Sequence, residues 1–229
     1  SFGNFKWSKQ IGDYAYDEGY AITVDDSAYV YITGMFSGTV DFDPAIQDTF
    51  NLAVVGSYDM FVLKLDSSGD FVWAKQTGGP VSTDYGNDIA VDTARNVYIT
   101  GIFSDTADFD PGIDTFNLIS LGMYDSYILK LDPLGNMIWV KQISGSNIIW
   151  GLSLDLDDWG NVYTAGYFVD SVDFDPGPND HYLSNSANYD GYVQKLDSKG
   201  NFKWAMQTGG NSNDECSAIK VDQGYVYIT

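Results

Sequence analysis

The chain has 229 residues, of which 44% are hydrophobic and 16% aromatic, so it can bury a full core. Thirty Asp and two Glu oppose ten Lys and a single Arg, and the net charge of −21 disfavours binding to nucleic acids or anionic membrane surfaces. No apolar run approaches the roughly 20 residues of a membrane-spanning helix, so no membrane insertion is expected.

One segment of the chain is written three times. Residues 29–44 read YVYITGMFSGTVDFDP, residues 96–111 read NVYITGIFSDTADFDP, and residues 161–176 read NVYTAGYFVDSVDFDP. A fourth copy begins with YVYIT at residues 225–229. The tryptophans keep the same step, with spacings of 66, 66 and 65 residues between Trp7, Trp73, Trp139 and Trp204. A fixed period of this length indicates one supersecondary unit repeated in an array.

Each unit is predicted to contain four short strands. In the first unit, residues 21–25 (AITVD) are short and apolar, and residues 29–34 alternate as a second strand after a tight turn. The equivalent inner strands of the next two units are predicted at residues 88–92 and 151–155. Residues 60–66 (MFVLKLD) form the third strand, in which only the lysine is expected to face solvent. A turn at residues 66–69 leads to the fourth strand at residues 71–76, and its Asp and Gly fit a type I turn with a bulge. Aromatic enrichment and the absence of helical periodicity predict an all-β chain.

The strand count predicts a β-propeller or a propeller fragment. Residues 5–10 match the fourth strand of a unit, so the chain is expected to contain fifteen strands. The predicted blades cover about residues 13–77, 78–143 and 144–208, and a partial blade at 209–229 takes 1–12 as an outer strand. A propeller needs about four to eight blades. The chain is therefore expected either to close as four blades or to belong to a larger polypeptide with further blades, and its interrupted last unit favours the second.

Two runs carry a family resemblance, GNDIAVDTARNVYITGIF…DFD and YDSYILKLDPLGNMIWVKQ. They resemble the bacterial β-propeller repeat known as SBBP, and the resemblance covers the whole chain. It implies a secreted or surface-displayed bacterial protein, often with several domains, and no defined activity. The third unit departs from the pattern, because Asn147 is aligned with Asp17 and Asp84, and Tyr-Thr-Ala replaces Tyr-Ile-Thr.

The recurring Asp-Phe-Asp segments are the candidate metal sites. Strand alternation would place both carboxylates of a segment on one face and the Phe on the other. Two adjacent carboxylates repel each other unless a cation or hydrogen-bond donors lie between them, and they could supply part of a calcium shell of six to eight oxygens. The alternative is a turn in which the Phe is an anchor and the carboxylates accept backbone N–H groups. The candidate calcium ligands are Asp41, Asp43, Asp108, Asp110, Asp173 and Asp175.

Two further acidic sets recur. One set precedes the innermost strand, where its oxygens could face a central channel, and the other set begins the third strand. The first set comprises Asp17, Asp84, Asn147 and Asp214, and the second comprises Asp59, Asp125 and Asp190. Turn formation is the alternative for both sets, and in the second set each Asp would bond the backbone of the turn that follows it. Neither combines a nucleophile with a base, and the single His181 and single Cys216 form no zinc cluster, so no catalytic residue is predicted.

Two classes of function remain. The first is a non-catalytic, secreted or cell-surface propeller that acts as a scaffold or binds a protein or glycan, because recurrence without a unique site is untypical of an enzyme. The second is a carboxylate-based enzyme of the glycoside hydrolase type, with aromatic residues as sugar platforms. The only local asymmetry that favours the enzyme lies in the third unit, at Trp150, Asp157, Asp158 and Trp159. The binding module is the preferred interpretation.

Overall fold

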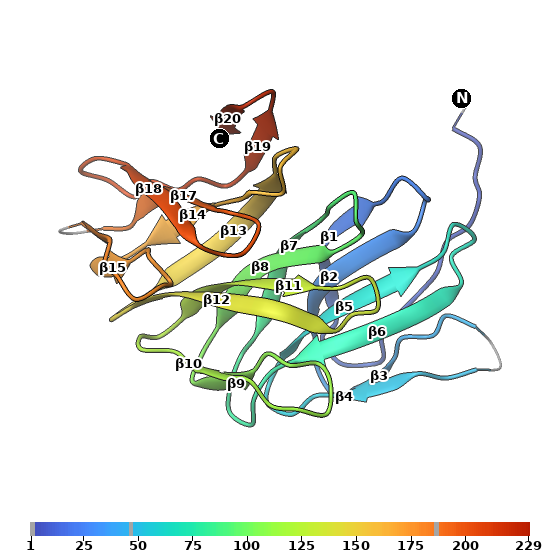
Figure 1. Ribbon diagram of the computed structural model, residues 1–229. Coiled ribbons are helices and arrows are strands. Elements are labelled where there is room, and N and C mark those ends of the chain that lie inside the picture. The colour runs from blue at the N-terminus through green and yellow to red at the C-terminus, as the bar shows by residue number, and fades with distance from the viewer. Residues whose placement is uncertain (1–2, 46–47, 186–187) are drawn as a thin grey trace.

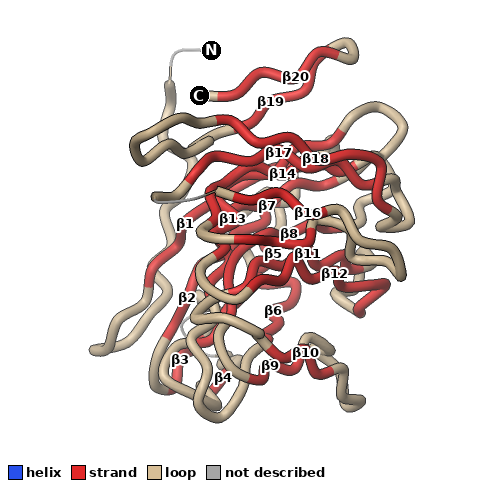
Figure 2. Tube along the Cα trace, turned by 90° about the vertical axis from the view of Figure 1, so that its left-hand side faces the viewer, coloured by secondary structure: helices blue, strands red, loops and turns tan. Residues whose placement is uncertain are grey.

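The computed structural model describes residues 3–45, 48–185 and 188–229, and every regular element in these ranges is a β-strand. Figure 2 shows these strands joined by loops and turns. The prediction of an all-β chain is confirmed. Across the described ranges, no helix is long and apolar enough to cross a membrane.

Three antiparallel sheets of four strands follow one another along the described part of the chain (Figure 1). Sheet 1 has the order β1 (Glu18–Val24), β2 (Val30–Phe36), β5 (Asp59–Leu65) and β6 (Phe71–Thr77). Sheet 2 has the order β7 (Tyr85–Val91), β8 (Val97–Phe103), β11 (Asp125–Leu131) and β12 (Met137–Gly145). Sheet 3 has the order β13 (Ile149–Leu156), β14 (Val162–Phe168), β17 (Asp190–Leu196) and β18 (Phe202–Thr208). A hairpin of β19 (Ile219–Asp222) and β20 (Tyr225–Ile228) follows sheet 3.

A short hairpin projects from each unit between its second and third long strands. These hairpins are β3 (Thr39–Asp41) with β4 (Asn51–Ala53), β9 (Thr106–Asp108) with β10 (Asn117–Ile119), and β15 (Ser171–Asp173) with β16 (Tyr182–Ser184). The third hairpin also extends sheet 2 to six strands, because β15 pairs with β12. The prediction of fifteen strands is therefore wrong, since the described residues form twenty. Three-residue strands are too short to show an alternating pattern in the sequence.

The core lies between successive sheets. Tyr31 and Met60 of sheet 1 pack with Ile89 and Tyr127 of sheet 2 in one buried cluster. Tyr98 of sheet 2 packs with residues of sheet 3 in the same manner. Each unit therefore buries one face against the next unit, as the repeat pattern of an array requires.

The third strands β5 and β11 are buried at every residue, including their lysines. Lys64 is only 6% exposed, and its Nζ lies 4.6 Å from the ring centre of Tyr29 and 5.0 Å from that of Tyr31. The expectation that this lysine faces solvent is wrong. Aromatic faces attract the ammonium group at such distances, and the apolar stem packs in the core.

The turns before the fourth strands agree with the prediction. Gly69 has a φ of +79° and donates its N–H to the carbonyl oxygen of Asp66, at 2.9 Å. The strand register shifts between Lys64 and Leu65, beside this turn. A type I turn followed by a left-handed residue with a bulge has these features, and glycine adopts that φ without strain.

Residues 5–10 are not a strand in the structure, in contrast to the prediction. They nevertheless follow the path of an outer strand. Trp7 Nε1 donates to the carbonyl oxygen of Ser67 at 3.0 Å, and Trp73 Nε1 donates to that of Pro133 at 3.1 Å, one unit further on. Trp7 therefore makes the same hydrogen bond as Trp73, although residues 5–10 do not pair with a strand.

The register of the third unit differs from the prediction by two residues. Ala90 pairs with Tyr98, and Asp155 pairs with Tyr163, which makes Asp157 and not Asp155 the counterpart of Asp92. The equivalent inner segment is therefore 153–157 and not 151–155. The sequence LDLDD offers three Asp residues, and only Asp157 precedes an Asn by the four residues that the turn requires.

The sheets form no closed ring within the described ranges, and Figure 1 shows the β19–β20 hairpin and sheet 1 at the two ends of the series. Four-stranded antiparallel units of this kind are consistent with propeller-like repeats. The number of blades stays a prediction.

Candidate functional site

The Asp-Phe-Asp segments form turns closed by their own carboxylates. Asp108 Oδ1 accepts hydrogen bonds from the N–H groups of Asp110, at 3.0 Å, and Phe116, at 2.8 Å. Asp110 Oδ1 accepts one from the N–H of Gly112 at 2.8 Å. The same bonds recur in the first and third units, at Asp41, Asp43, Asp173 and Asp175. Each predicted metal ligand therefore has a structural role through its Oδ1 atom.

The Phe of each segment is an anchor, as the alternative interpretation requires. Phe109 is 1% exposed, with its ring centre 5.2 Å from that of Phe103 and 4.7 Å from that of Tyr127. Phe42 and Phe174 make the same pair of aromatic contacts in their own units. Among the described residues, no three His, Cys, Asp or Glu side chains gather as a metal site would require. The geometry therefore supports the turn, and calcium binding remains a hypothesis.

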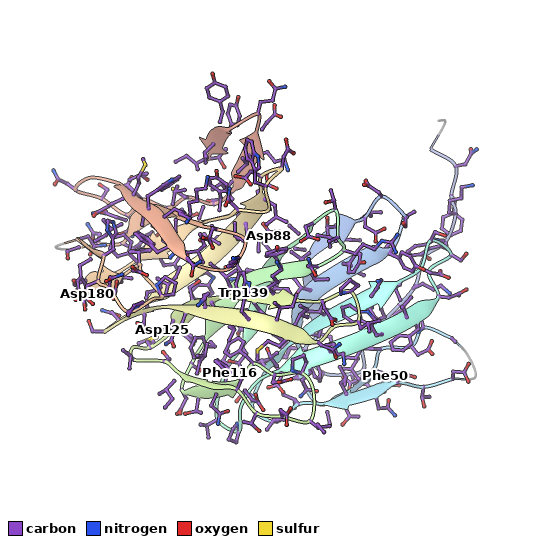
Figure 3. The ribbon with its side chains drawn as sticks, in the orientation of Figure 1. Phe50, Asp88, Phe116, Asp125, Trp139 and Asp180 are labelled. Carbon is purple, nitrogen blue, oxygen red and sulfur yellow. The ribbon has the colours of Figure 1, made fainter. Side chains whose placement is uncertain are left out.

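The third-strand set consists of buried carboxylates, of which Asp59 and Asp125 hold the short hairpins of their units to the sheets. Asp125 Oδ2 accepts hydrogen bonds from the N–H of Leu121, at 3.0 Å, and from Gln142 Nε2, at 2.6 Å (Figure 3). Gln142 also donates to the carbonyl oxygen of Ile119 in β10, at 2.8 Å. Burial raises the pKa of Asp125, and these donors partly offset the effect. The carboxylate closes the turn before the strand, whereas the sequence suggested the turn after it.

The first of the other acidic sets is not a ring of oxygens, because its third member is apolar. Asp84 donates its N–H to the carbonyl oxygen of Tyr58 at 3.0 Å, and Ile149 donates to that of Tyr124 at 2.9 Å. Ile149 is therefore the counterpart of Asp84, and the assignment of Asn147 to this position is wrong. The one-residue shortening of the third unit concealed this equivalence in the sequence.

Asp84 is the most perturbed acid of this set. Its side chain is 1% exposed, and Ser82 donates a hydrogen bond to its Oδ2 atom. Burial raises the pKa of Asp84 to about 8, the bond from Ser82 opposes this, and the charge of Asp59 adds to it. A carboxyl group in this state holds its proton at neutral pH.

Hydrogen bonds between consecutive inner strands were not foreseen from the sequence. Asp88 Oδ2 on β7 accepts from Ser153 Oγ and from the N–H of Leu154 on β13, both at 2.8 Å (Figure 3). Asp155 on β13 accepts from the N–H of Val221 at 2.6 Å and pairs with Lys220 Nζ at 2.9 Å. Asp88 and Asp155 both lie within predicted inner strands and not in turns. A carboxylate inside an inner strand is the sequence signal that could have predicted these hydrogen bonds.

A groove lies between the β7–β8 and β13–β14 hairpins of sheets 2 and 3. It has a volume of about 350 Å³, and its wall includes Thr93, Asp158 and Trp159. Trp159 is 74% exposed, whereas Trp150 stacks on Tyr167 with ring centres 6.0 Å apart. Of the four residues that distinguish the third unit, Trp159 and Asp158 are therefore exposed at the surface.

Asp157, at the base of this groove, is a fixed turn residue. It accepts hydrogen bonds from the N–H of Trp159 at 3.0 Å, from Asn161 Nδ2 at 2.7 Å and from the Tyr163 hydroxyl at 3.1 Å. Burial alone would raise the pKa of Asp157, but these donors outweigh it and lower the pKa. Such a carboxylate stays ionised and has no proton to give.

A second and larger groove, of about 650 Å³, runs between the β3–β4 hairpin and the Asp-Phe-Asp segment of the next unit. Its wall includes Phe50, Lys75, Asp108 and Asp110. Two predicted calcium ligands therefore border an open groove, although their Oδ1 atoms are bonded within the turn.

The family model of the SBBP beta-propeller repeat matches residues 6–35 and 72–101. The second segment runs from β6 of sheet 1 to β8 of sheet 2, so one match spans the outer strand of one unit and the inner strands of the next. Two segments of the chain thus match the SBBP beta-propeller repeat. The resemblance drawn from the sequence is confirmed over these two segments.

Two curated relatives are similar to parts of the chain. An uncharacterized WD repeat-containing protein of Acanthamoeba polyphaga mimivirus is 27% identical over 184 residues, which cover 71% of this chain and 13% of that protein. The regulatory protein FlaEY of Caulobacter vibrioides is 26% identical over 108 residues, which cover 47% of this chain and 11% of that protein. The chain thus spans only a small part of the length of these relatives.

A solved structure of a protein of unknown function from Bacteroides caccae covers 83% of this chain and 81% of its own, at 8% sequence identity. Its TM-score of 0.30 is too low to support any statement about the fold.

Proposed function

We propose that the chain is a non-catalytic repeat scaffold that binds a protein or glycan at a bacterial cell surface, as a secreted or displayed part of a larger polypeptide. The observation that supports this is the recurrence of structural roles. Asp41, Asp108 and Asp173 each close the same turn, and Asp59 and Asp125 accept from equivalent Gln residues. A catalytic centre would break this symmetry.

The groove at Trp159 is the proposed ligand site. Its tryptophan occupies the turn position that Ala94 occupies in the preceding unit, so it is not needed to form the hairpin. An exposed indole provides a flat apolar surface for the C–H face of a sugar or for an apolar side chain, and Asp158 and Thr93 supply polar groups beside it.

The test is a glycan array and a surface-protein binding screen with Trp159→Ala and a matched control, Leu134→Ala. Leu134 is 70% exposed in the β11–β12 turn, so both changes remove an exposed apolar side chain. We expect binding to be lost with Trp159→Ala and retained with Leu134→Ala. Equal binding by the two variants would place the ligand site elsewhere.

The second candidate is the carboxylate-based enzyme, which the asymmetry of the third unit favours. A glycoside hydrolase needs one carboxyl group that carries a proton and another that is ionised, on either side of a bond. The lowered pKa of Asp157 supports the ionised role alone. Hydrolysis of chromogenic glycosides that disappears in Asp158→Asn would favour the enzyme over the scaffold.

Calcium binding is a further part of the proposal. The Oδ1 atoms of the Asp-Phe-Asp segments are bonded within their turns, so the cation would use their Oδ2 atoms and nearby carbonyl groups. At roughly tenfold excess over the dissociation constant, each independent site would add about 1.4 kcal/mol of stability. Chelation should then lower the melting temperature, and sodium at equal ionic strength should not restore it. The variant Asp43→Asn/Asp110→Asn/Asp175→Asn should lose this response; if it keeps it, the ions bind elsewhere.

A further inference from the structure

The short hairpin of the second unit exposes large apolar side chains at positions where the other units have small or polar ones. Ile119, at the end of β10, is 60% exposed, and Leu121 and Met123, in the segment that follows, are 70% and 61% exposed. These three residues are called the β10 patch. The β9–β10 hairpin that carries it lies at the periphery of sheet 2 (Figure 1).

Register and backbone hydrogen bonds identify the counterparts of the β10 patch. Ile119 has the same cross-strand position in its hairpin as Ala53 and Ser184 have in theirs. Met123 donates its N–H to the loop before the next inner strand, as Ser57 does. All three counterparts are exposed. The fold therefore accepts small or polar residues at both positions, and the large apolar side chains are not needed for packing.

Hydrogen bonds fix the backbone of the β10 patch. Gln142 Nε2 on β12 donates to the carbonyl oxygen of Ile119 at 2.8 Å. The buried carboxylate of Asp125 accepts from the N–H of Leu121 at 3.0 Å. The exposed side chains thus stand on a backbone that is already tied to sheet 2. A partner would therefore not have to order this segment when it binds, which lowers the entropy cost of binding.

The part of the chain that carries the β10 patch is acidic. Residues 96–129 include five Asp and no Lys or Arg. Asp105 is exposed beside the patch, because its carbonyl oxygen accepts the N–H of Ser120 at 2.8 Å. It has a φ of +54° at the turn position where the first unit has Gly38. Glycine suits this backbone better than Asp, so the turn does not require the carboxylate.

We propose that the β10 patch is a docking surface for a protein segment that carries both apolar and basic side chains. Apolar side chains of the partner cover the patch, and a Lys or Arg pairs with Asp105. A second copy of this chain is the poorer occupant, because each copy carries a charge of −21. The groove at Trp159 is bordered by Lys130 near the end of β11, whereas the patch precedes the start of β11, so the two sites are separate.

The probe is a synthetic peptide in which Leu and Lys alternate, with affinity measured by fluorescence anisotropy. An acidic chain attracts any lysine-rich peptide, so a peptide with Ser in place of each Leu measures that contribution. We expect the Leu–Lys peptide to bind about tenfold or more tightly than the Ser–Lys peptide. Equal affinity for the two would overturn the proposal. Binding of a peptide of alternating Leu and Glu would also overturn it, because the charge would then not matter.

Ile119→Ser/Met123→Asn removes most of the patch by introducing the residues that the third unit has at these positions, Ser184 and Asn188. The preference for the Leu–Lys peptide should then disappear. A preference that persists in this folded variant would place the peptide elsewhere. Circular dichroism spectra that match the parent show that the variant is folded.

Val55→Ser is the matched control. Val55 is 59% exposed, and its N–H bonds to Asp59 as that of Leu121 bonds to Asp125, so it is the counterpart of Leu121 in the first unit. This variant should keep the full preference. An equal loss of preference in Val55→Ser and in the double variant would contradict a site confined to the second unit.

Asp105→Gly tests the charge, and it introduces the residue that the first unit has in this turn. Affinity for the Leu–Lys peptide should fall by about two- to fivefold at low salt and by less at high salt. Trp159→Ala should not change this affinity, and a loss there would place the peptide in the groove and overturn the proposal. Self-association of the parent that the double variant abolishes, measured by sedimentation, would show that a second copy covers the patch and would also overturn it.

Discussion

At the junction of sheets 1 and 2, Thr77 and Asp84 stand where Ile143 and Ile149 stand at the junction of sheets 2 and 3. All four side chains are buried, with exposures of 3%, 1%, 1% and 0% in that order. Both positions change together, from two polar residues to two aliphatic ones. The same backbone thus accepts either chemistry, which shows that the polar pair is not required for the packing of one unit on the next.

The two junctions differ in whether a buried polar group can ionise. Each has two buried polar atoms without a hydrogen-bond partner among the described residues: Thr77 Oγ1 and Asp84 Oδ1 at the first junction, and Ser126 Oγ and the Tyr192 hydroxyl at the second. Gly79 donates its N–H to Ser82 Oγ at 2.7 Å, whereas its counterpart Gly145 donates to Asp125 Oδ1 at 3.4 Å. A buried polar atom without a partner costs about 1–3 kcal/mol. Both junctions carry this cost, but only the junction of sheets 1 and 2 contains a buried carboxyl group, so we expect it to be the more sensitive to pH.

The largest change in the free energy of unfolding is expected when an Asp replaces an Ile at the junction of sheets 2 and 3. Ile149→Asp should lower the free energy of unfolding at pH 7 by about 4 kcal/mol or more, because it removes a buried aliphatic group and buries a carboxyl group without a donor such as Ser82. Denaturant titration measures this change. Ile149→Ala is the control for lost packing, and it should cost less than the Asp variant at pH 7. If the two variants cost the same, the junction tolerates an acid as readily as a cavity.

The reverse exchange should strengthen the polar junction. Thr77→Ile/Asp84→Ile should raise the free energy of unfolding by about 1–3 kcal/mol at pH 8, since two unsatisfied groups are replaced by apolar ones of similar size. The gain should depend on pH in a defined direction. The pKa of Asp84 is about 8 in the folded chain against an ordinary value of 3.8, so the folded state holds the proton more tightly.

The stability that this proton confers is fully present below pH 3.8 and is lost as the pH rises to about 8. The slope is at most about 1.4 kcal/mol per pH unit. The free energy of unfolding of the double Ile variant relative to the parent should therefore rise between pH 4 and pH 8 and then level off, with the parent the more stable at pH 4. An advantage that is constant with pH would mean that Asp84 ionises normally.

The smallest effect concerns the tryptophans that cross the two junctions. Trp73 Nε1 donates to the carbonyl oxygen of Pro133, whereas the buried Trp139 Nε1 has no partner among the described residues. Trp73→Phe should cost about 1 kcal/mol more than Trp139→Phe, because only the first loses a hydrogen bond. Thermal unfolding of both variants measures the difference, and a larger loss for Trp139→Phe would contradict it.

The sequence was sufficient for those features that depend on local pattern. The period of 65–66 residues, the alternating strands and the Asp…Gly turns all specify local geometry, and the structure agrees with each. The buried position of Lys64 was missed because its environment comes from the rings of Tyr29, just before β2, and Tyr31, on β2. The carbonyl oxygen of Pro133, which accepts from Nζ at 3.4 Å, completes it. Such tertiary contacts leave no trace in local alternation.

The candidate sites were less predictable than the fold. The spacing of Asp-Phe-Asp is compatible with a metal site and with a turn, and only the bonds from Asp110 and Phe116 to Asp108 show which donors are present. The exchange of Thr77 and Asp84 for Ile143 and Ile149 was also not predicted, because the third unit is one residue shorter and Ile149 was not recognised as the counterpart of Asp84. Equivalence between repeats becomes certain only when the register is known.

The most direct test of the difference between the two junctions is the ionisation of Asp84 itself. Carbon-13 NMR of a chain labelled at the Asp carboxyl groups, with the resonance assigned by its loss in Asp84→Asn, follows this group through a pH titration. A midpoint near pH 8 is the result expected from its burial at the junction of sheets 1 and 2. A midpoint close to the ordinary value of about 4 would show that the group is hydrated or paired. It would contradict the account that Asp84 is buried in its protonated form at this junction.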